Sequence, residues 1–156
     1  MLFNSRLLPN VTQADRSLFC EVARLLSRAA EAAADMRGTD GFQCHSICRA
    51  LRIRMPELRL LDGFYLGLRT LPAEKKRGVR RELMTAGHSW LMTPDGAIID
   101  PYPVGCISLN PLLIPTRGID VAFGADLYCA DPAVTSRIAC RDVWRRSVVL
   151  AGLLCK

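Results

Sequence analysis

Long apolar runs are missing from this sequence of 156 residues. The longest, SVVLAGLLC from Ser147 to Cys155, falls well short of the roughly 20 residues that a membrane span requires. A secretory signal is missing as well, because the N-terminal stretch MLFNSRLLPNVTQADR turns polar almost at once. We therefore expect a soluble, cytoplasmic protein with no membrane partner, and secretion by a signal-independent route is left open.

Aromatic residues are scarce, at 6% of the chain, and none stands within its two basic stretches. These stretches, EKKRGVRRE (Glu74 to Glu82) and RRS (Arg145 to Ser147), hold much of the net charge of +6. Nucleic-acid platforms usually combine basic residues with aromatic side chains on which bases stack. We therefore interpret both stretches as solvated surface and expect no nucleic-acid partner.

A regular disulfide framework is also lacking. The seven cysteines are odd in number and irregularly spaced, which favours free thiols in a reducing compartment. They are Cys20, Cys44, Cys48, Cys106, Cys129, Cys140 and Cys155. Half of the chain is apolar and no repeat or linker divides it, so residues 1–156 are expected to form a single domain with its own core.

Helical periodicity dominates the N-terminal part of the chain. Thr12 is a candidate N-cap with Asp15 three residues later, and apolar residues then recur at helical spacing until Gly38. A second apolar-periodic segment begins at Cys44 and ends before Pro56. The sequence therefore predicts two consecutive helices.

Strand-like segments follow these helices. The residues suited to strands lie in Glu57–Thr70 and in the stretch HSWLMTPDGAIIDPYP from His88 to Pro103. Residues 102–124 predict an irregular covering segment with one short strand, and residues 131–154 predict a helix, although LYCADPAV also suits a strand before it. The fold class is therefore α+β, with helices packed on a small, mostly antiparallel sheet.

The Pro-Asp-Gly turn inside the hairpin determines which side chains share a face. It suits a type I turn followed by a left-handed Gly96, a three-residue loop with a bulge. Trp90 then faces Asp100, and His88 becomes a diagonal neighbour of Asp100 at roughly 7 to 8 Å between backbones. A two-residue loop would instead place Asp100 opposite Ser89, on the other face from His88.

Cys44 stands at the predicted first turn of the second helix. Unpaired backbone N–H groups and the helix dipole stabilise a thiolate there and lower the pKa of the thiol. Cys48, one turn further in, is expected to be an ordinary core residue. His45 should point about 100° away from Cys44 around the helix, so we assign it no catalytic role.

Three motifs in this order, GFQCHSICRAL, GHSWL and DGAIIDPYP, resemble the transglutaminase-like branch of the papain-like cysteine enzymes. The resemblance extends from Gly41 to about Gly105. It is based on a Cys at a helix start, a strand His followed two residues later by Trp, and a strand Asp followed by Pro. It implies a papain-like or transglutaminase-like core in one domain over residues 1–156.

The resemblance also implies a thiol acyl-transfer site. Cys44 would attack an amide or peptide carbonyl, His88 would act as base and then acid, and Asp100 would orient His88. The backbone N–H of Cys44 and a side chain, Gln43 or Trp90, would bind the oxyanion or substrate. The substrate would be a protein, a peptide or a small amide, hydrolysis and transfer are both open, and no cofactor or metal is required.

Three other functions remain open from the sequence. A metal-binding module could use Cys44, Cys48 and His88, with His45 as a further ligand, although the sequence has no second Cys pair at knuckle spacing and structural zinc sites normally have four ligands. A catalytically inactive member of the same fold could serve as a binding or regulatory protein. A secreted effector or toxin could use the same three residues on a foreign protein. Metal content and thiol alkylation would separate the first two from an active enzyme.

Overall fold

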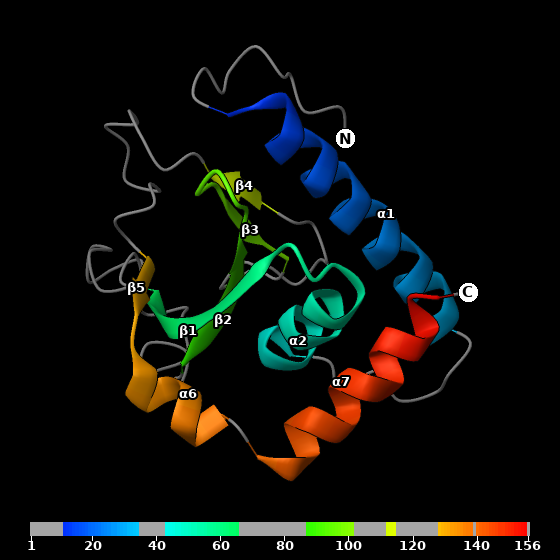
Figure 1. Ribbon diagram of the computed structural model, residues 1–156. Coiled ribbons are helices and arrows are strands. Elements are labelled where there is room, and N and C mark those ends of the chain that lie inside the picture. Colours follow the sequence, from blue (N-terminus) through cyan, green and yellow to red (C-terminus); the bar gives the residue numbers. More distant parts are fainter. Residues whose placement is uncertain are drawn as a thin grey trace, which may run out of the picture.

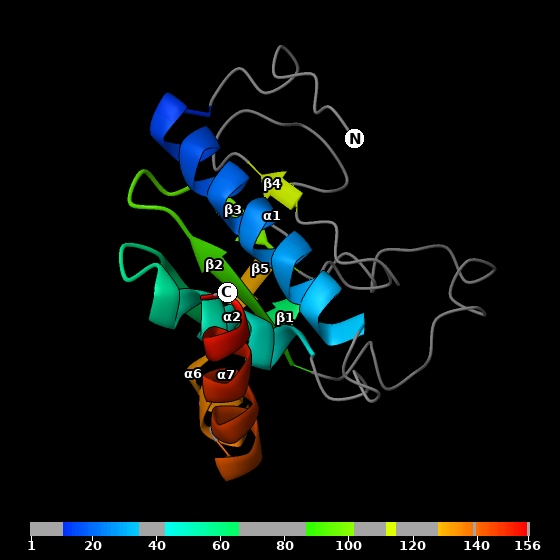
Figure 2. The same cartoon turned by 90° about the vertical axis from the view of Figure 1, so that its right-hand side faces the viewer.

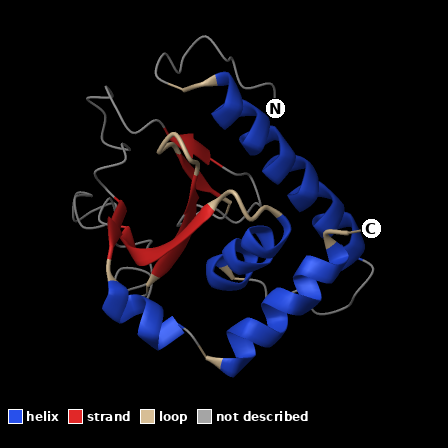
Figure 3. Ribbon diagram, in the orientation of Figure 1, coloured by secondary structure: helices blue, strands red, loops and turns tan. Residues whose placement is uncertain are grey.

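The computed structural model describes residues 11–34, 43–65, 87–101, 112–114, 128–138 and 140–155. Within these ranges, four helices pack around a five-stranded antiparallel sheet with the strand order β4-β3-β2-β1-β5 (Figures 1 and 3). The helices are α1 (Gln13–Ala34), α2 (Cys44–Arg54), α6 (Pro132–Ile138) and α7 (Arg141–Leu153). The strands are β1 (Arg59–Tyr65), β2 (His88–Met92), β3 (Ile98–Asp100), β4 (Leu112–Ile114) and β5 (Tyr128–Ala130). The predicted α+β class with an antiparallel sheet is confirmed.

Helix α1 begins with the predicted cap. The Thr12 backbone N–H donates to Asp15 Oδ2 at 2.9 Å, and the Asp15 N–H donates to Thr12 Oγ1 at 3.0 Å. This reciprocal pair satisfies two of the N–H groups that a helix start leaves without a partner. The Thr12 hydroxyl also donates to Asp95 at 2.8 Å, which ties the start of α1 to the turn between β2 and β3. The predicted end near Gly38 lies outside the described residues.

Helix α2 lies at the centre of the molecule. It begins at Cys44 and ends at Arg54, two residues before Pro56, in agreement with the predicted helix. Its apolar face is fully buried, with Ile47, Cys48 and Leu51 at 1% exposure or less. The views in Figures 1 and 2 place α2 between the sheet on one side and α7 on the other. The N-terminus of α2, and with it Cys44, is held in place by packing on both sides.

The two faces of the sheet carry different clusters because side chains alternate along each strand. Leu91, Ile99 and Leu113 point to the helical side and join one core with α1, α2 and α7. Trp90, Ile98 and Ile114 point to the opposite side and join a second cluster, to which Tyr128 of β5 also belongs. His88 follows the Trp90 face by this alternation, and Ser89 follows the Leu91 face.

The C-terminal prediction of one helix over residues 131–154 is wrong, because the chain forms two helices. Asp131 caps α6, accepting the Ala133 N–H at 2.8 Å, whereas Cys140 has extended backbone angles and precedes α7. In one continuous helix, the buried Leu150 of α7 would point about 120° away from the buried Ile138 of α6. The break lets α6 cover β1 while α7 covers α2.

The strand predictions are confirmed where they fall on described residues. Strand β1 forms within the predicted segment Glu57–Thr70, β4 is the short strand expected within residues 102–124, and β5 forms in LYCADPAV. The basic stretch Glu74 to Glu82 lies outside the described residues. Among the helices that the structure describes, none is long and apolar enough to cross a membrane.

Candidate active site

The turn between β2 and β3 sets the register of the hairpin. Gly96 has a φ of 93°, and its N–H donates to the Thr93 carbonyl at 3.0 Å. The Thr93 N–H donates to the Ala97 carbonyl at 2.9 Å, which closes the three-residue loop. Beyond it, Met92 pairs with Ile98, and Leu91 pairs with Ile99. The predicted bulged turn and its register are confirmed.

The same register brings His88 and Asp100 together. His88 Nε2 donates to Asp100 Oδ2 at 2.8 Å, and the two residues are 2% and 0% exposed. The Tyr128 hydroxyl donates to the same Oδ2 at 2.8 Å. Since Asp100 binds Nε2, the ring nitrogen left for another partner is Nδ1. The predicted contact between the imidazole and the carboxylate is therefore confirmed.

Cys44 is the first residue of α2, after Gln43 in extended conformation. Burial raises the pKa of the Cys44 thiol, but hydrogen bonds from His45 and His88 and the charge of these rings outweigh it and lower the pKa to about 6. Burial lowers the pKa of His88, but hydrogen bonds to Asp100 and Cys44 raise it to about 9. Between these values the favoured form is a thiolate beside an imidazolium.

His45 is placed differently from the sequence prediction. The expectation that it would point away from Cys44 is wrong, because His45 Nδ1 lies 3.6 Å from Cys44 Sγ. The angle of about 100° separates the Cα–Cβ bonds of neighbouring helical residues. The imidazole extends beyond those bonds at the open end of the helix, and a contact of 2.7 Å between His45 Nδ1 and Ser89 Oγ fixes its direction.

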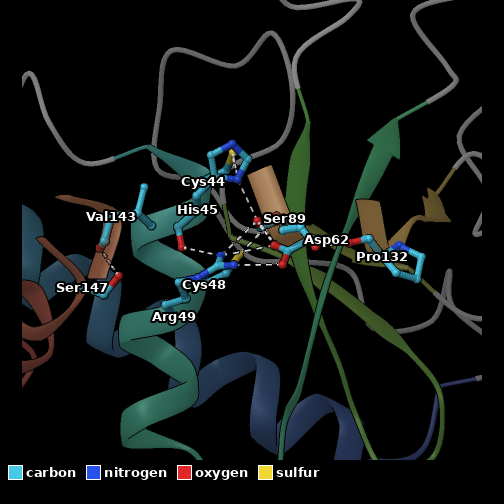
Figure 4. Close-up of polar contacts among 10 residues, drawn as sticks. Cys44, His45, Cys48, Arg49, Asp62, Ser89, Pro132, Val143 and Ser147 are labelled. Carbon is cyan, nitrogen blue, oxygen red and sulfur yellow. Dashed lines mark hydrogen bonds and ion pairs between the residues drawn. The ribbon is translucent and has the colours of Figure 1, made fainter. Parts of the chain in front are cut away.

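A polar network lies behind His45 and connects α2 to the sheet (Figure 4). The Ser89 hydroxyl donates to Asp62 Oδ1, and Asp62 lies directly opposite Ser89 in the pairing of β1 with β2. Arg49 donates two hydrogen bonds to the same carboxylate, from Nη2 to Oδ2 at 2.9 Å and from Nη1 to Oδ1 at 3.2 Å. Arg49 Nη1 also donates to the His45 carbonyl at 3.2 Å.

Asp62 keeps its charge in this buried position. Its side chain is 2% exposed, and burial alone raises the pKa of a carboxyl group. Hydrogen bonds from Arg49 and Ser89, together with the charge of Arg49, outweigh burial and lower the pKa of Asp62 below its usual value. The network is thus anchored by an ionised carboxylate.

The two residues predicted to assist at the oxyanion have different surroundings. Gln43 is exposed, and its carbonyl accepts the N–H groups of Ser46 and Ile47 at 3.0 and 3.1 Å. Trp90 is 1% exposed and stacks beside His88, with ring centroids 6.1 Å apart. The Trp90 indole N–H has no hydrogen-bond partner within the part of the chain that the structure describes. Their roles toward a substrate stay predictions.

Cys48 is the core thiol that the sequence predicts. It is fully buried, donates to the Ser89 carbonyl at 3.1 Å, and burial raises its pKa well above the usual value. Among the described residues, no group of three or more His, Cys, Asp or Glu side chains is placed to hold a metal ion. The metal-binding alternative therefore gains no support from these residues.

Several residues of the site were not predicted from the sequence. Asp62 carried a signal, since a lone charge inside the apolar strand RLLDGFY requires a partner when buried. Arg49 stands four residues after His45 and so shares its side of α2, which was a second signal. Tyr128 carried none, because its approach to Asp100 depends on the pairing of β5 with β1, far apart in sequence.

No family model, no curated protein and no solved structure matches this chain. The resemblance to transglutaminase-like enzymes is therefore based on the three sequence motifs alone.

Proposed function

We propose that this protein is a cysteine-dependent acyl-transfer enzyme that acts on an amide or peptide bond, with a papain-like arrangement of its core. Cys44 is the nucleophile, His88 the acid-base group and Asp100 the residue that orients His88. The observation that carries the proposal is the contact of 2.8 Å between His88 Nε2 and the buried carboxylate of Asp100. Next to this pair, hydrogen bonds from His45 and His88 and the charge of both rings outweigh burial and lower the pKa of the Cys44 thiol to about 6.

The chemistry follows from these contacts. Asp100 holds the proton on His88 Nε2, so Nδ1 is the nitrogen that receives the proton of the Cys44 thiol. The thiolate attacks the carbonyl carbon, and the imidazolium then protonates the leaving amine as the C–N bond breaks. A thioester on Cys44 remains, and water or a second amine displaces the thiol from it. These reaction steps require no cofactor.

The position of Cys44 supports the same assignment. The first residues of a helix have backbone N–H groups without intrahelical partners, which suit both a thiolate and a developing oxyanion. We assign the Cys44 N–H to the oxyanion, with Gln43 or Trp90 as the side-chain donor. The exposed Gln43 side chain makes no capping hydrogen bond, which leaves its amide available to a substrate.

Acyl-enzyme trapping tests the proposal. The protein is incubated with a panel of peptide amides and a fluorescent primary amine, and the measurements are ammonia release, new peptide N-termini, amine incorporation and the intact mass of the enzyme. We expect turnover and a hydroxylamine-sensitive adduct on Cys44, both lost in Cys44→Ala and kept in Cys20→Ala, which alters an exposed thiol. Turnover that persists in Cys44→Ala would rule out the mechanism. Its absence from the wild type would favour the inactive binding protein.

A further inference from the structure

Both histidines of the chain lie beside the same thiol. The sequence contains two. His45 Nδ1 is 3.6 Å from Cys44 Sγ, and both His45 and His88 lower the pKa of this thiol. They are supported from opposite faces of the sheet. His88 is bound to Asp100 on the Trp90 face, whereas His45 contacts Ser89, which points to the α2 face (Figure 4). With two imidazoles beside one thiol, either ring could act as the base or as a hydrogen-bond donor to the thiolate.

The hydrogen positions in the polar network determine which ring nitrogen of His45 is protonated. Asp62 is an ionised carboxylate and has only acceptors, so the Ser89 hydroxyl hydrogen points to it. A hydroxyl has one hydrogen, and Ser89 Oγ therefore has only lone pairs left for its contact of 2.7 Å with His45 Nδ1. Nδ1 must be the donor in that contact. His45 consequently carries a hydrogen on Nδ1 whether the ring is neutral or charged.

A nitrogen that already holds a hydrogen cannot accept one. Nδ1 is also the ring nitrogen of His45 in the contact of 3.6 Å with Cys44 Sγ, so His45 does not remove the thiol proton through this contact. Its N–H can instead be shared between Ser89 Oγ and the sulfur. A hydrogen bond to a charged acceptor is stronger than one to a neutral acceptor, so this donor favours the thiolate over the thiol.

We infer that His45 is a second hydrogen-bond donor to the Cys44 thiolate, with its Nδ1–H fixed by Ser89, Asp62 and Arg49, and that His88 alone acts as the base. The inference rests on the proposed function only in taking Cys44 as the nucleophile. The two rings then differ in tautomer, because His88 holds its hydrogen on Nε2 and His45 holds its hydrogen on Nδ1. The ring bound directly to a carboxylate moves the proton, and the ring held by a hydroxyl positions the sulfur.

Substitution of His45 distinguishes a donor from a base. In His45→Asn, the side-chain amide can present an N–H near the original Nδ1, whereas His45→Ala presents none. Alkylation of Cys44 by iodoacetamide, resolved by site with mass spectrometry, reports the thiolate fraction. We expect His45→Ala to react about tenfold more slowly than wild type at about pH 5 and equally fast at about pH 9, with His45→Asn within about twofold of wild type throughout.

Alkylation requires no substrate, so it separates this inference from the proposed function. An unchanged rate for His45→Ala at acidic pH, or an equal loss in His45→Asn, would overturn the role of His45 while leaving His88 and Cys44 in place. A purely structural effect would instead change the alkylation rates of several cysteines at every pH. If Cys44 of the wild type reacts no faster than Cys20, the proposed function itself fails.

A measurement on the unaltered protein keeps the inference testable if a variant does not fold. Long-range proton–nitrogen spectra of the ¹⁵N-histidine-labelled protein show which ring nitrogens carry hydrogen. We expect a protonated Nδ1 for His45 near neutral pH. A His45 ring with its hydrogen on Nε2 alone would contradict the inference.

Discussion

The two histidines beside Cys44 differ in what holds them. His88 donates directly to the buried carboxylate of Asp100, whereas His45 reaches the buried carboxylate of Asp62 only through the Ser89 hydroxyl. A carboxylate in direct contact stabilises the positive ring, which suits a group that takes up a proton. A hydroxyl whose hydrogen is already used offers a lone pair and fixes the tautomer. Similar residue types on the two faces of one sheet therefore give their rings different chemistry.

Of the substitutions considered, Asp100→Asn should cause the largest loss of activity. The amide cannot stabilise the imidazolium and allows the wrong tautomer, so kcat should fall by about 10³- to 10⁴-fold. The measurement is kcat with whichever acyl donor the wild type turns over, alongside circular dichroism to confirm folding. A loss of less than about tenfold would show that the two rings do not differ in the way described.

Asp62→Asn should act on stability more than on chemistry. It leaves the Arg49 guanidinium, whose side chain is 10% exposed, without its carboxylate, and breaking one partner of a buried pair costs about 3 to 5 kcal/mol. Urea unfolding followed by circular dichroism measures this cost. Glu21→Gln is the matched control, since Glu21 pairs with Arg24 on the exposed side of α1 and should unfold like the wild type. Equal stability of the two variants would contradict the anchoring role of Asp62.

Gly96→Val should have the smallest effect of the three and tests the turn that aligns His88 with Asp100. A β-branched residue at a φ of 93° is strained by about 1 to 2 kcal/mol, so the melting temperature should fall by several degrees.

Gly152→Ala serves as its control. A Cβ at this helical position meets nothing within 4 Å, and alanine favours a helix over glycine. We expect its melting temperature to stay level or rise. A Gly96→Val protein as stable as Gly152→Ala would argue against the bulged turn.

The part of the site that the sequence predicts is the part that local rules control. The Pro-Asp-Gly turn determines the register from adjacent residues, and that register places His88 beside Asp100. The helix start at Cys44 likewise follows from periodicity over one segment. In both cases the interacting residues are close in sequence, so propensity and spacing suffice.

The remainder depends on contacts between distant segments. Ser89 meets Asp62 through the pairing of β2 with β1, and Arg49 reaches Asp62 because α2 packs on that strand. The error over His45 has the same origin, since the helical angle describes its Cβ and Ser89 determines the position of its ring. The break before α7 arises because two apolar faces, out of phase by more than a quarter turn, cover different elements.

The coupling of the Cys44 thiolate to the His88 imidazolium is tested by the pH dependence of iodoacetamide labelling at each of the seven cysteines, in wild type and in His88→Ala. The thiol of Cys44 has a pKa lowered to about 6, so its labelling should rise as pH increases through that value and should be the fastest of the set. Removing His88 takes away a donor and a positive charge, so the rise should move to higher pH. Labelling of Cys44 no faster than that of exposed Cys20, or a profile unaffected by His88→Ala, would contradict the coupling of thiolate and imidazole on which the account is based.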